Sequence, residues 1–178
     1  IVNGSASSGN LDFMNPPGVI LKLNGDVQKA SLPPVDVIII VDTSSWQQLG
    51  SMADVIRNSS ATRVVIDHHV SSDQMEAIEF RDVTAAATGE LIFELGQASG
   101  MSFDADTANC LYAAIATDTG WFRFPSTTPR TMRIAAALMD AGAQPHFVYS
   151  MVHEQVSLSR LRLGGRILAR ATAEVDSR

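Results

Sequence analysis

Apolar residues occur along the chain in short continuous runs and in longer stretches with helical spacing. The runs at 35–41 and 63–66 are rich in β-branched residues and have the length of a strand. Such runs are typical of strands that are covered on both faces, as in a parallel sheet. The pattern predicts strands at 19–23, 35–41, 63–66 and 77–80, with the last of these at an outer position.

Between and after these runs, apolar residues recur every three or four positions, which predicts amphipathic helices. Asp104 and Thr127 are candidate N-caps, whereas Gly164 and Gly165 weaken the last helix by about 1 kcal/mol each. The predicted helices span 46–58, 84–99, 104–117, 127–142, 145–153 and 156–172. The order of the elements predicts an α/β fold, a doubly wound and mainly parallel sheet with helices on both faces.

Composition and charge narrow the class of protein. The chain has 178 residues, of which 46% are hydrophobic, and Lys+Arg 13 against Asp+Glu 19 give a formal net charge of −6. This charge argues against a protein that coats long DNA or a membrane surface, but not against a phosphate substrate, because bound divalent metals supply positive charge. The single cysteine, Cys110, excludes an internal disulfide and suits a reducing cytosol. No run is apolar enough to span a membrane, and a chain that begins at Ile1 gives little information on signal peptides.

Acidic and histidine side chains follow three of the predicted elements. Asp42 follows the strand at 35–41, Asp67, His68 and His69 follow the strand at 63–66, and Asp118 follows the helix at 104–117. Ligands of an open parallel sheet bind at the carboxyl ends of its strands, and neighbouring strands lie about 5 Å apart. We therefore expect Asp42 and His68 at the same edge of the sheet, whereas the spacing alone does not place Asp118 there.

These residue types in one place point to a metal site. Crowded carboxylates repel one another, and a divalent metal removes that cost. Oxygen ligands with one imidazole suit Mn²⁺ or Mg²⁺ better than a thiolate-bound zinc. Taken singly, Asp42 has a simpler interpretation as a helix cap, the adjacent histidines as surface residues, and Asp118 as a residue of a helix C-terminal turn. The prediction rests on their conjunction.

The sequence around these residues resembles the motifs of a known family. The stretch at 65–69, Val-Ile-Asp-His-His, resembles the signature of the DHH phosphoesterase superfamily. The stretch at 39–43 resembles the preceding strand-plus-aspartate motif of that family, and the stretch at 116–124 resembles its later motif. Thr-Asp-Thr-Gly followed by Phe-Arg-Phe-Pro-Ser-Thr-Thr is most similar to the NrnA-type branch, the bifunctional oligoribonuclease and adenosine bisphosphate phosphatase proteins. The resemblance covers residues 35–169.

The resemblance implies a role for each residue of the predicted site. Asp42 is implied to bridge two metals, His68 and Asp118 to bind the second metal, and His69 to contact the scissile phosphate. Asp67 is expected to orient a ligand histidine, as carboxylates beside metal sites commonly do.

The resemblance also implies the chemistry. Two Mn²⁺ ions in the complete site, or Mg²⁺ in their place, activate a hydroxide that attacks the phosphorus of a short RNA, of adenosine 3′,5′-bisphosphate or of a related dinucleotide. Thr119 and Arg123 are weaker candidates for contact with the substrate or for support of the site, and a solvated arginine is the alternative for Arg123. The expected location is the cytoplasm, the expected partners include neither a membrane nor long DNA, and a homodimer is left open.

The chain departs from the family pattern at both ends. Nothing before Asp42 matches the first motif, a histidine followed by Asp-x-Asp, and the glycine-rich C-terminal domain is missing. We expect residues 1–155 to form a DHH catalytic domain without its first strand–helix unit, and residues 156–178 to form a linker helix toward a missing substrate-binding domain. This piece is expected not to hold both metals by itself, and full activity of residues 1–178 with metal would contradict that expectation.

Four alternatives belong to other classes of function. An exopolyphosphatase or inorganic pyrophosphatase of the same superfamily would use the same site, and a catalytically inactive nucleotide-binding module would keep only the fold. A RecJ-like single-strand DNA exonuclease is disfavoured by the acidic balance, which gives little sign of a long basic groove. A dinucleotide-binding oxidoreductase is disfavoured because no Gly-x-Gly-x-x-Gly follows a strand.

Overall fold

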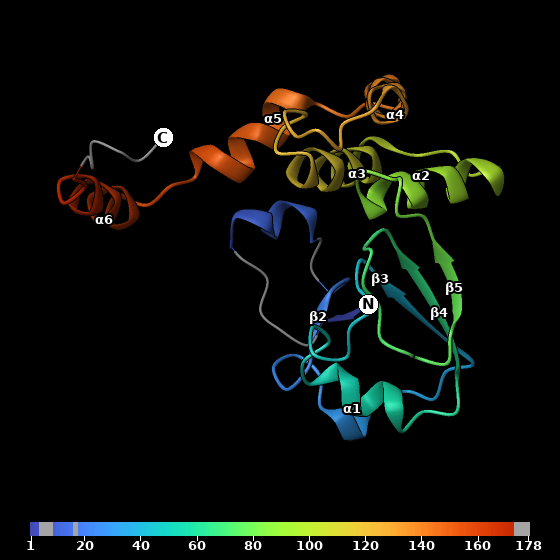
Figure 1. Ribbon diagram of the computed structural model, residues 1–178. Helices are drawn as coiled ribbons and strands as arrows, with labels where there is room; N and C mark the ends of the chain where they lie inside the picture. The colour runs from blue at the N-terminus through green and yellow to red at the C-terminus, as the bar shows by residue number, and fades with distance from the viewer. Residues whose placement is uncertain (4–8, 16–17, 173–178) are drawn as a thin grey trace.

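A parallel sheet and a layer of helices make up most of the molecule (Figure 1), in a computed structural model that describes residues 1–3, 9–15 and 18–172. The strands β3 (Val37–Val41), β4 (Thr62–Asp67) and β5 (Ile78–Arg81) pair in parallel in the order β3-β4-β5, and β1 (Val2–Asn3) pairs in parallel with β2 (Leu21–Lys22). The helices are η1 (Gly9–Met14), η2 (Lys29–Ser31), α1 (Met52–Arg57), α2 (Thr88–Ala98), α3 (Ala105–Asp118), α4 (Pro129–Asp140), α5 (Pro145–Tyr149), the π-helix η3 (Ser150–Glu154) and α6 (Leu158–Leu168).

Helices lie on both faces of the sheet, as the sequence predicts. Ile40 of β3 and Val65 of β4 are buried against Ile56 of α1 on one face. On the other face, Ile66 of β4 is buried with Leu91 of α2. Because successive residues of a strand point to opposite faces, the apolar run of β4 supplies side chains to both of these clusters. The predicted α/β fold with a mainly parallel sheet is confirmed.

The prediction that the first long strand is covered on both faces is wrong. Val37, Ile39 and Val41 share one face of β3, and Ile39 keeps 61% of its surface exposed. β3 forms an edge of the three-stranded sheet, and α2 packs over β4. The apolar run therefore correctly predicts that β3 pairs in parallel, but it wrongly predicts that both faces of β3 are buried.

The helical layer has its own core. Leu111 and Ile115 of α3, Leu138 of α4 and Val148 of α5 are buried in one cluster. α6 extends away from this layer (Figure 1). No helix in the described part of the chain has the length and apolar character that crossing a membrane requires.

The predicted caps are confirmed for α3 and displaced by one residue for α4. Asp104 accepts a hydrogen bond of 2.8 Å from the backbone N–H of Thr107. α4 begins after Thr128 rather than Thr127, because Thr128 and Thr131 exchange hydrogen bonds in a capping box.

Three helices are shorter than predicted, and one continues in a different geometry. The predicted helix at 46–58 is helical only from Met52, and the predicted helix at 84–99 only from Thr88, because Ala87 has an extended backbone. The predicted helix at 145–153 is an α-helix only to Tyr149 and then continues as η3. The predicted helix at 156–172 is helical over 158–168 and keeps both of its glycines inside.

Ion pairs between charged side chains connect the helical layer to the end of β5. Nη1 of Arg130, on α4, lies 2.6 Å from Oδ2 of Asp82, directly after β5. Hydrogen bonds from Thr84 and from Arg130 lower the pKa of Asp82 from 3.8 to about 2. A carboxyl group whose pKa is lowered in the folded state stabilises the fold at pH values above its ordinary pKa. This stabilisation is lost as the pH falls through the folded-state pKa.

We therefore expect the free energy of unfolding to decrease between about pH 4 and about pH 2, with Asp82 contributing about 1 kcal/mol after allowance for its exposure. Urea unfolding of the protein and of Asp82→Asn, from pH 5 to pH 2.5, checks this. The variant is expected to be less stable at pH 5 and to lose less stability on acidification. Parallel pH curves for the two proteins would contradict the prediction.

Candidate metal centre

The candidate residues meet where the parallel strands end. In Figure 1 the arrowheads of β3, β4 and β5 point toward the layer that contains α2 and α3. Asp42 directly follows β3, Asp67 is the last residue of β4, and Asp118 is the last residue of α3. Val41 pairs with Ile66, which places Asp42 level with the Asp67–His69 segment. The structure thus brings Asp118 to the edge where the strand order predicts only the other residues and the family resemblance adds Asp118.

Two carboxylates face the same ring nitrogen of His68. Nε2 of His68 lies 3.7 Å from Oδ1 of Asp42 and 3.6 Å from Oδ2 of Asp118. Both distances are longer than a hydrogen bond. The other ring nitrogen, Nδ1, lies 3.2 Å from the backbone carbonyl oxygen of Ala85. A carbonyl oxygen only accepts, so Nδ1 carries a hydrogen, and in the neutral form of the ring Nε2 presents its lone pair to the two carboxylates.

This donor set fits a divalent cation. A lone pair and two carboxylates directed at one point repel one another, and a cation among them turns the repulsion into attraction. The pKa of Asp118 is raised by burial and by the nearby charge of Asp42, although His68 and His69 oppose this. One imidazole with oxygen ligands suits Mn²⁺ or Mg²⁺. The side chains of Asp42 and Asp118 also remain partly exposed, so an ion has access to them.

Asp42 has an uncommon backbone conformation. Its φ is +62°, in the left-handed region that few residues other than glycine adopt, with Asn and Asp the main exceptions. Its backbone N–H donates to the carbonyl oxygen of Ile66 at 3.0 Å and so extends the strand pairing. Such conformations cost about 1–3 kcal/mol and gather at functional sites. The conformation holds the carboxylate of Asp42 over the end of β4.

Asp67 is a fully buried carboxylate that holds the ring of His69 through a hydrogen bond. Its Oδ1 accepts from Nδ1 of His69 at 2.7 Å and from the backbone N–H of His68 at 2.9 Å, and its Oδ2 accepts from Oγ of Ser44 at 2.7 Å. Burial alone would raise the pKa of Asp67, but the hydrogen bonds from His69 and Ser44 lower it overall. Asp67 therefore orients the ring of His69, whereas the ring of His68, which the sequence assigned to it, is held by Ala85.

His69 lies at the rim of the site. A ring nitrogen of His69, a ring nitrogen of His68 and a carboxylate oxygen of Asp42 lie within 4.8 Å of one another. The side chain of His69 is 45% exposed. Its hydrogen bond to Asp67 raises the pKa of His69, against the opposing effect of burial. His69 thus joins the cluster from the side that solvent reaches.

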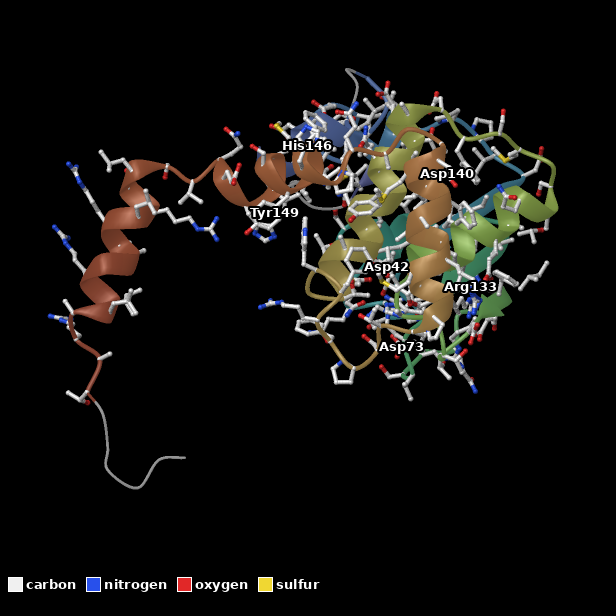
Figure 2. All side chains as sticks on the ribbon, turned by 90° about the horizontal axis from the view of Figure 1, so that it is seen from above. Asp42, Asp73, Arg133, Asp140, His146 and Tyr149 are labelled. Atoms are coloured by element: carbon white, nitrogen blue, oxygen red, sulfur yellow. The ribbon has the colours of Figure 1, made fainter. Side chains whose placement is uncertain are left out.

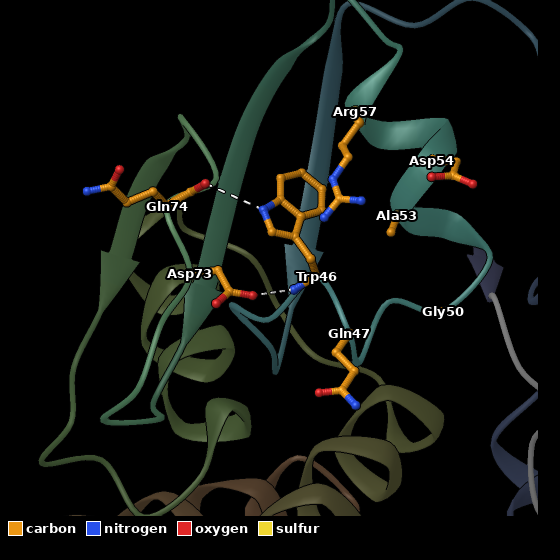
Figure 3. A pocket seen from close by; sticks show the side chains of 8 residues that line it. All are labelled: Trp46, Gln47, Gly50, Ala53, Asp54, Arg57, Asp73 and Gln74. Atoms are coloured by element: carbon orange, nitrogen blue, oxygen red, sulfur yellow. Dashed lines mark hydrogen bonds between the residues drawn. The ribbon is translucent and has the colours of Figure 1, made fainter.

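The two loops that carry these residues are fastened to each other. The backbone N–H of Asp73 donates to the carbonyl oxygen of Ser44 at 2.7 Å, and the backbone N–H of Trp46 donates to Oδ2 of Asp73 at 2.7 Å. Figure 3 shows this second contact, and it also shows the indole of Trp46 reaching the carbonyl of Gln74 and lying against Arg57, whose guanidinium carbon is 4.4 Å from the ring centroid. Fastened loops keep the site residues at fixed separations, as catalysis requires.

The two weaker candidates, Thr119 and Arg123, have different surroundings in the structure. Thr119 is fully buried, and its Oγ1 donates to the carbonyl oxygen of Ile115 at 2.7 Å and accepts from the N–H of Phe122 at 3.1 Å. Thr119 therefore holds the turn after α3, as a residue that supports the site would, and direct contact of Thr119 with a substrate stays a prediction. Arg123 is exposed, and its Nε donates to the carbonyl oxygen of Gly120 at 2.7 Å. The guanidinium of Arg123 thus lies beside the turn that follows Asp118.

Sequence reasoning missed Ser44 and Ala85. Ser44 shows no distinguishing signal, because a serine two residues after an aspartate is typical of any loop or helix cap. Ala85 acts through its backbone carbonyl, which no side-chain pattern reports. The available hint was the run Ala85-Ala86-Ala87 beside the predicted helix start, where small residues allow the backbone to approach closely.

Ser44→Ala is expected to lower the free energy of unfolding by about 1–3 kcal/mol, because it leaves Oδ2 of the buried Asp67 without a partner. Urea unfolding at neutral pH measures the change. Ser45→Ala is the matched control, since Ser45 is only partly buried and its side chain does not contact Asp67. Equal stability of the two variants would contradict the role given to Ser44.

Comparisons with known proteins show which family the chain resembles. A family model described as DHH family, N-terminal domain, matches residues 5–115. The bifunctional oligoribonuclease and PAP phosphatase NrnA of Bacillus subtilis is 29% identical over 134 residues, which are 74% of this chain and 42% of that protein. The uncharacterized protein MG371 of Mycoplasma genitalium is 34% identical over 139 residues, which are 78% of this chain and 39% of that protein.

A solved structure resembles nearly the whole chain. The crystal structure of an exopolyphosphatase-related protein from Bacteroides fragilis matches with a TM-score of 0.89 and 26% identity, over 97% of this chain and 52% of that chain. The chain therefore spans about half, or less, of the length of these three proteins.

Proposed function

The chain belongs to the DHH family, and on this basis we propose that it forms the catalytic domain of a metal-dependent phosphoesterase that hydrolyses short oligoribonucleotides, adenosine 3′,5′-bisphosphate or related dinucleotides. The observation that carries the proposal is the arrangement around Nε2 of His68, which faces the carboxylates of Asp42 and Asp118 at 3.7 and 3.6 Å. With His68 in its neutral form, this arrangement gathers three electron-rich donor groups, and it is suited to a cation.

We propose that Asp42, His68 and Asp118 hold Mn²⁺, with Mg²⁺ as the alternative ion. When bound, such a metal lowers the pKa of a water molecule and polarises a phosphoryl oxygen. Asp42 is the ligand that a second ion would share. The hydrogen bond from Nδ1 of His68 to Ala85 fixes the tautomer that ligation needs, as partners of ligand histidines commonly do.

His69 is proposed to contact the phosphate of the substrate. Its ring is exposed at the rim, and its Nδ1 is held by the buried carboxylate of Asp67, so the remaining ring nitrogen is free to face a phosphoryl oxygen. A histidine that is fixed on one side and open on the other binds a ligand without a large loss of side-chain freedom. Asp67 acts as a positioning residue, because it reaches the substrate only through His69.

The choice of nucleotide substrates is supported by the NrnA relative from Bacillus subtilis, which is named a bifunctional oligoribonuclease and PAP phosphatase. The alternative, an exopolyphosphatase or inorganic pyrophosphatase, is supported by the exopolyphosphatase-related structure from Bacteroides fragilis. The net charge of −6 gives no sign of a surface for long nucleic acids, so small substrates are favoured in either case. Residues 1–155 are the proposed catalytic domain, and the segment from 156 onward is the proposed linker.

Hydrolysis of a substrate panel tests the proposal. The full-length protein in Mn²⁺ is assayed against a diadenylate, adenosine 3′,5′-bisphosphate, pyrophosphate and polyphosphate. The proposal predicts metal-dependent release of AMP from the first two substrates and slow or absent phosphate release from the others. Preference for pyrophosphate or polyphosphate would favour the alternative, and binding of nucleotides without hydrolysis of any substrate would favour an inactive binding module.

A further inference from the structure

A cavity lies beside the turn that follows α3. It has a volume of about 560 Å³ and is lined by Thr117, Gly120, Trp121, Arg123, Tyr149 and His153. Cavities of about 300–1,000 Å³ are the usual size for small-molecule sites. One wall comes from the turn after α3 and the other from the end of α5 and from η3. Tyr149 lies at the side of the body from which the chain continues to α6 (Figure 2).

Three aromatic rings meet at this cavity. The ring centroids of Trp121 and Tyr149 lie 5.2 Å apart at 82°, those of Trp121 and His153 4.6 Å apart at 70°, and those of Tyr149 and His153 4.9 Å apart. Edge-to-face contacts of this kind hold each ring at a fixed angle while part of its surface stays open. Tyr149 keeps 43% of its surface exposed. The cavity therefore offers a rigid aromatic surface to a ligand.

The backbone is irregular on both walls of the cavity where it carries these rings. Trp121 and Phe122 both have a φ of +61°, a conformation that bulky residues rarely adopt. It is held by a hydrogen bond of 2.6 Å from the N–H of Trp121 to the carbonyl of Ala116 and by the bond from Phe122 to Thr119. On the opposite wall, Tyr149 and His153 lie at the start and inside of a π-helical turn, a feature that is frequent at functional sites.

The cavity and the metal centre share the end of α3. Thr117 and Gly120, which line the cavity, flank Asp118, whose carboxylate faces His68. The cavity therefore adjoins the helix end that carries a proposed metal ligand. Arg123 adds a positive charge on the cavity wall, and its Nη atoms remain available because only Nε is used by Gly120.

We propose that this cavity binds the nucleobase of the substrate, stacked on Tyr149 and the neighbouring rings, with Arg123 directed at the adjacent phosphate or sugar. The inference rests on the proposed nucleotide phosphoesterase function and specifies which part of the substrate the domain itself recognises. Stacking of a base on an aromatic side chain contributes about 1–3 kcal/mol and tolerates all bases, because every base has a flat face. The cavity is therefore a site that distinguishes nucleotides from phosphates without a base.

The test compares AMP with ribose 5-phosphate, which has the same phosphate and sugar but no base. Calorimetry in Mn²⁺ gives both dissociation constants for the full-length protein. Wild-type protein is expected to bind AMP about 10-fold more tightly or better. Tyr149→Leu is expected to reduce this ratio at least about 5-fold and to leave ribose 5-phosphate binding unchanged, whereas Tyr149→Phe restores the ratio.

Two further variants make the comparison specific. His153→Ala removes a second ring from an exposed position and is expected to reduce the ratio as well, so the result does not depend on one substitution. Phe80→Leu removes a partly exposed aromatic ring of β5 that lies outside the cavity, and it is expected to leave the ratio unchanged.

The outcomes separate this inference from the proposed function. An unchanged ratio in Tyr149→Leu and His153→Ala, or an equal loss of AMP and ribose 5-phosphate binding, overturns the nucleobase site. If diadenylate hydrolysis that depends on Asp42 persists in that case, the phosphoesterase function stands and only the base site fails. If hydrolysis is absent from wild-type protein but the ratio falls as expected, the base site stands as part of a binding module.

Discussion

Asp42→Asn is expected to reduce metal-dependent hydrolysis of a diadenylate by at least about 100-fold, because it removes the carboxylate that faces His68 and that two metals would share. The amide keeps the size and hydrogen-bonding shape of the side chain but loses its charge. Asn also tolerates the left-handed backbone at this position, where φ is +62°. The fold is therefore expected to survive, and the loss of activity to come from the metal site.

Asp36→Asn is the matched control for this experiment. Asp36 is exposed and stands at the opposite end of the same strand, just before β3. The substitution changes the net charge of the protein by the same amount, but Asp36 lies far from the carboxyl ends of the strands. Equal hydrolysis rates for Asp42→Asn and Asp36→Asn would contradict a metal centre at Asp42, whereas loss in Asp42→Asn alone agrees with it.

Arg130→Met is expected to lower the free energy of unfolding by about 3 kcal/mol, because it leaves a buried carboxylate without its cation. Nε of Arg130 lies 3.7 Å from Oε2 of Glu90, whose side chain is fully buried, and its other nitrogens pair with Asp82 and Glu94. Among the residues that the structure describes, none forms a hydrogen bond with Oε1 of Glu90. Urea unfolding at pH 7 measures the loss.

The same variant is expected to weaken metal binding through the loop before α2. Oε2 of Glu90 accepts a hydrogen bond of 3.3 Å from the N–H of Ala86, and the preceding carbonyl, that of Ala85, holds Nδ1 of His68. A displaced Glu90 therefore releases the group that orients a proposed ligand. Loss of such supporting partners typically costs about 10–100-fold in metal affinity.

Arg133→Met and a double variant complete this test. Arg133 is exposed on the same helix, and its replacement is expected to change stability by less than about 0.5 kcal/mol. Glu90→Gln combined with Arg130→Met is expected to recover part of the stability, because the amide carries no charge that needs a partner. A loss below about 1 kcal/mol in Arg130→Met would show that the buried pair contributes little.

The strands and the class of fold could be predicted from the sequence because their signal is local. The β-branched runs at 35–41 and 63–66 specify parallel strands whatever surrounds them. Burial depends on what packs nearby, so the exposed face of β3 was not predictable from its own residues. The predicted start of the helix at 84–99 was wrong for the same reason. Ala85 and Ala86 favour a helix locally, but their backbone groups form hydrogen bonds with His68 and Glu90 instead.

The candidate site was predictable where it follows strand ends and not where it depends on tertiary contacts. Asp42 and His68 follow neighbouring strands, and parallel pairing alone brings them together. Asp118 ends a helix, and only the packing of α3 over the carboxyl ends of the strands places it 3.6 Å from His68. The cavity at Tyr149 was not predictable, because its walls join segments about 30 residues apart through a π-helical turn that sequence patterns do not report.

The most direct measurement is an anomalous difference map from crystals of the full-length protein grown with Mn²⁺. The metal centre proposed here predicts a manganese peak in contact with Nε2 of His68 and with the carboxylates of Asp42 and Asp118. It also predicts that Nδ1 of His68 keeps its hydrogen bond to Ala85 in the loaded protein. Manganese bound elsewhere, or none at this position with His68 hydrogen-bonded directly to a protonated carboxyl group, would contradict a metal-dependent phosphoesterase built on these three residues.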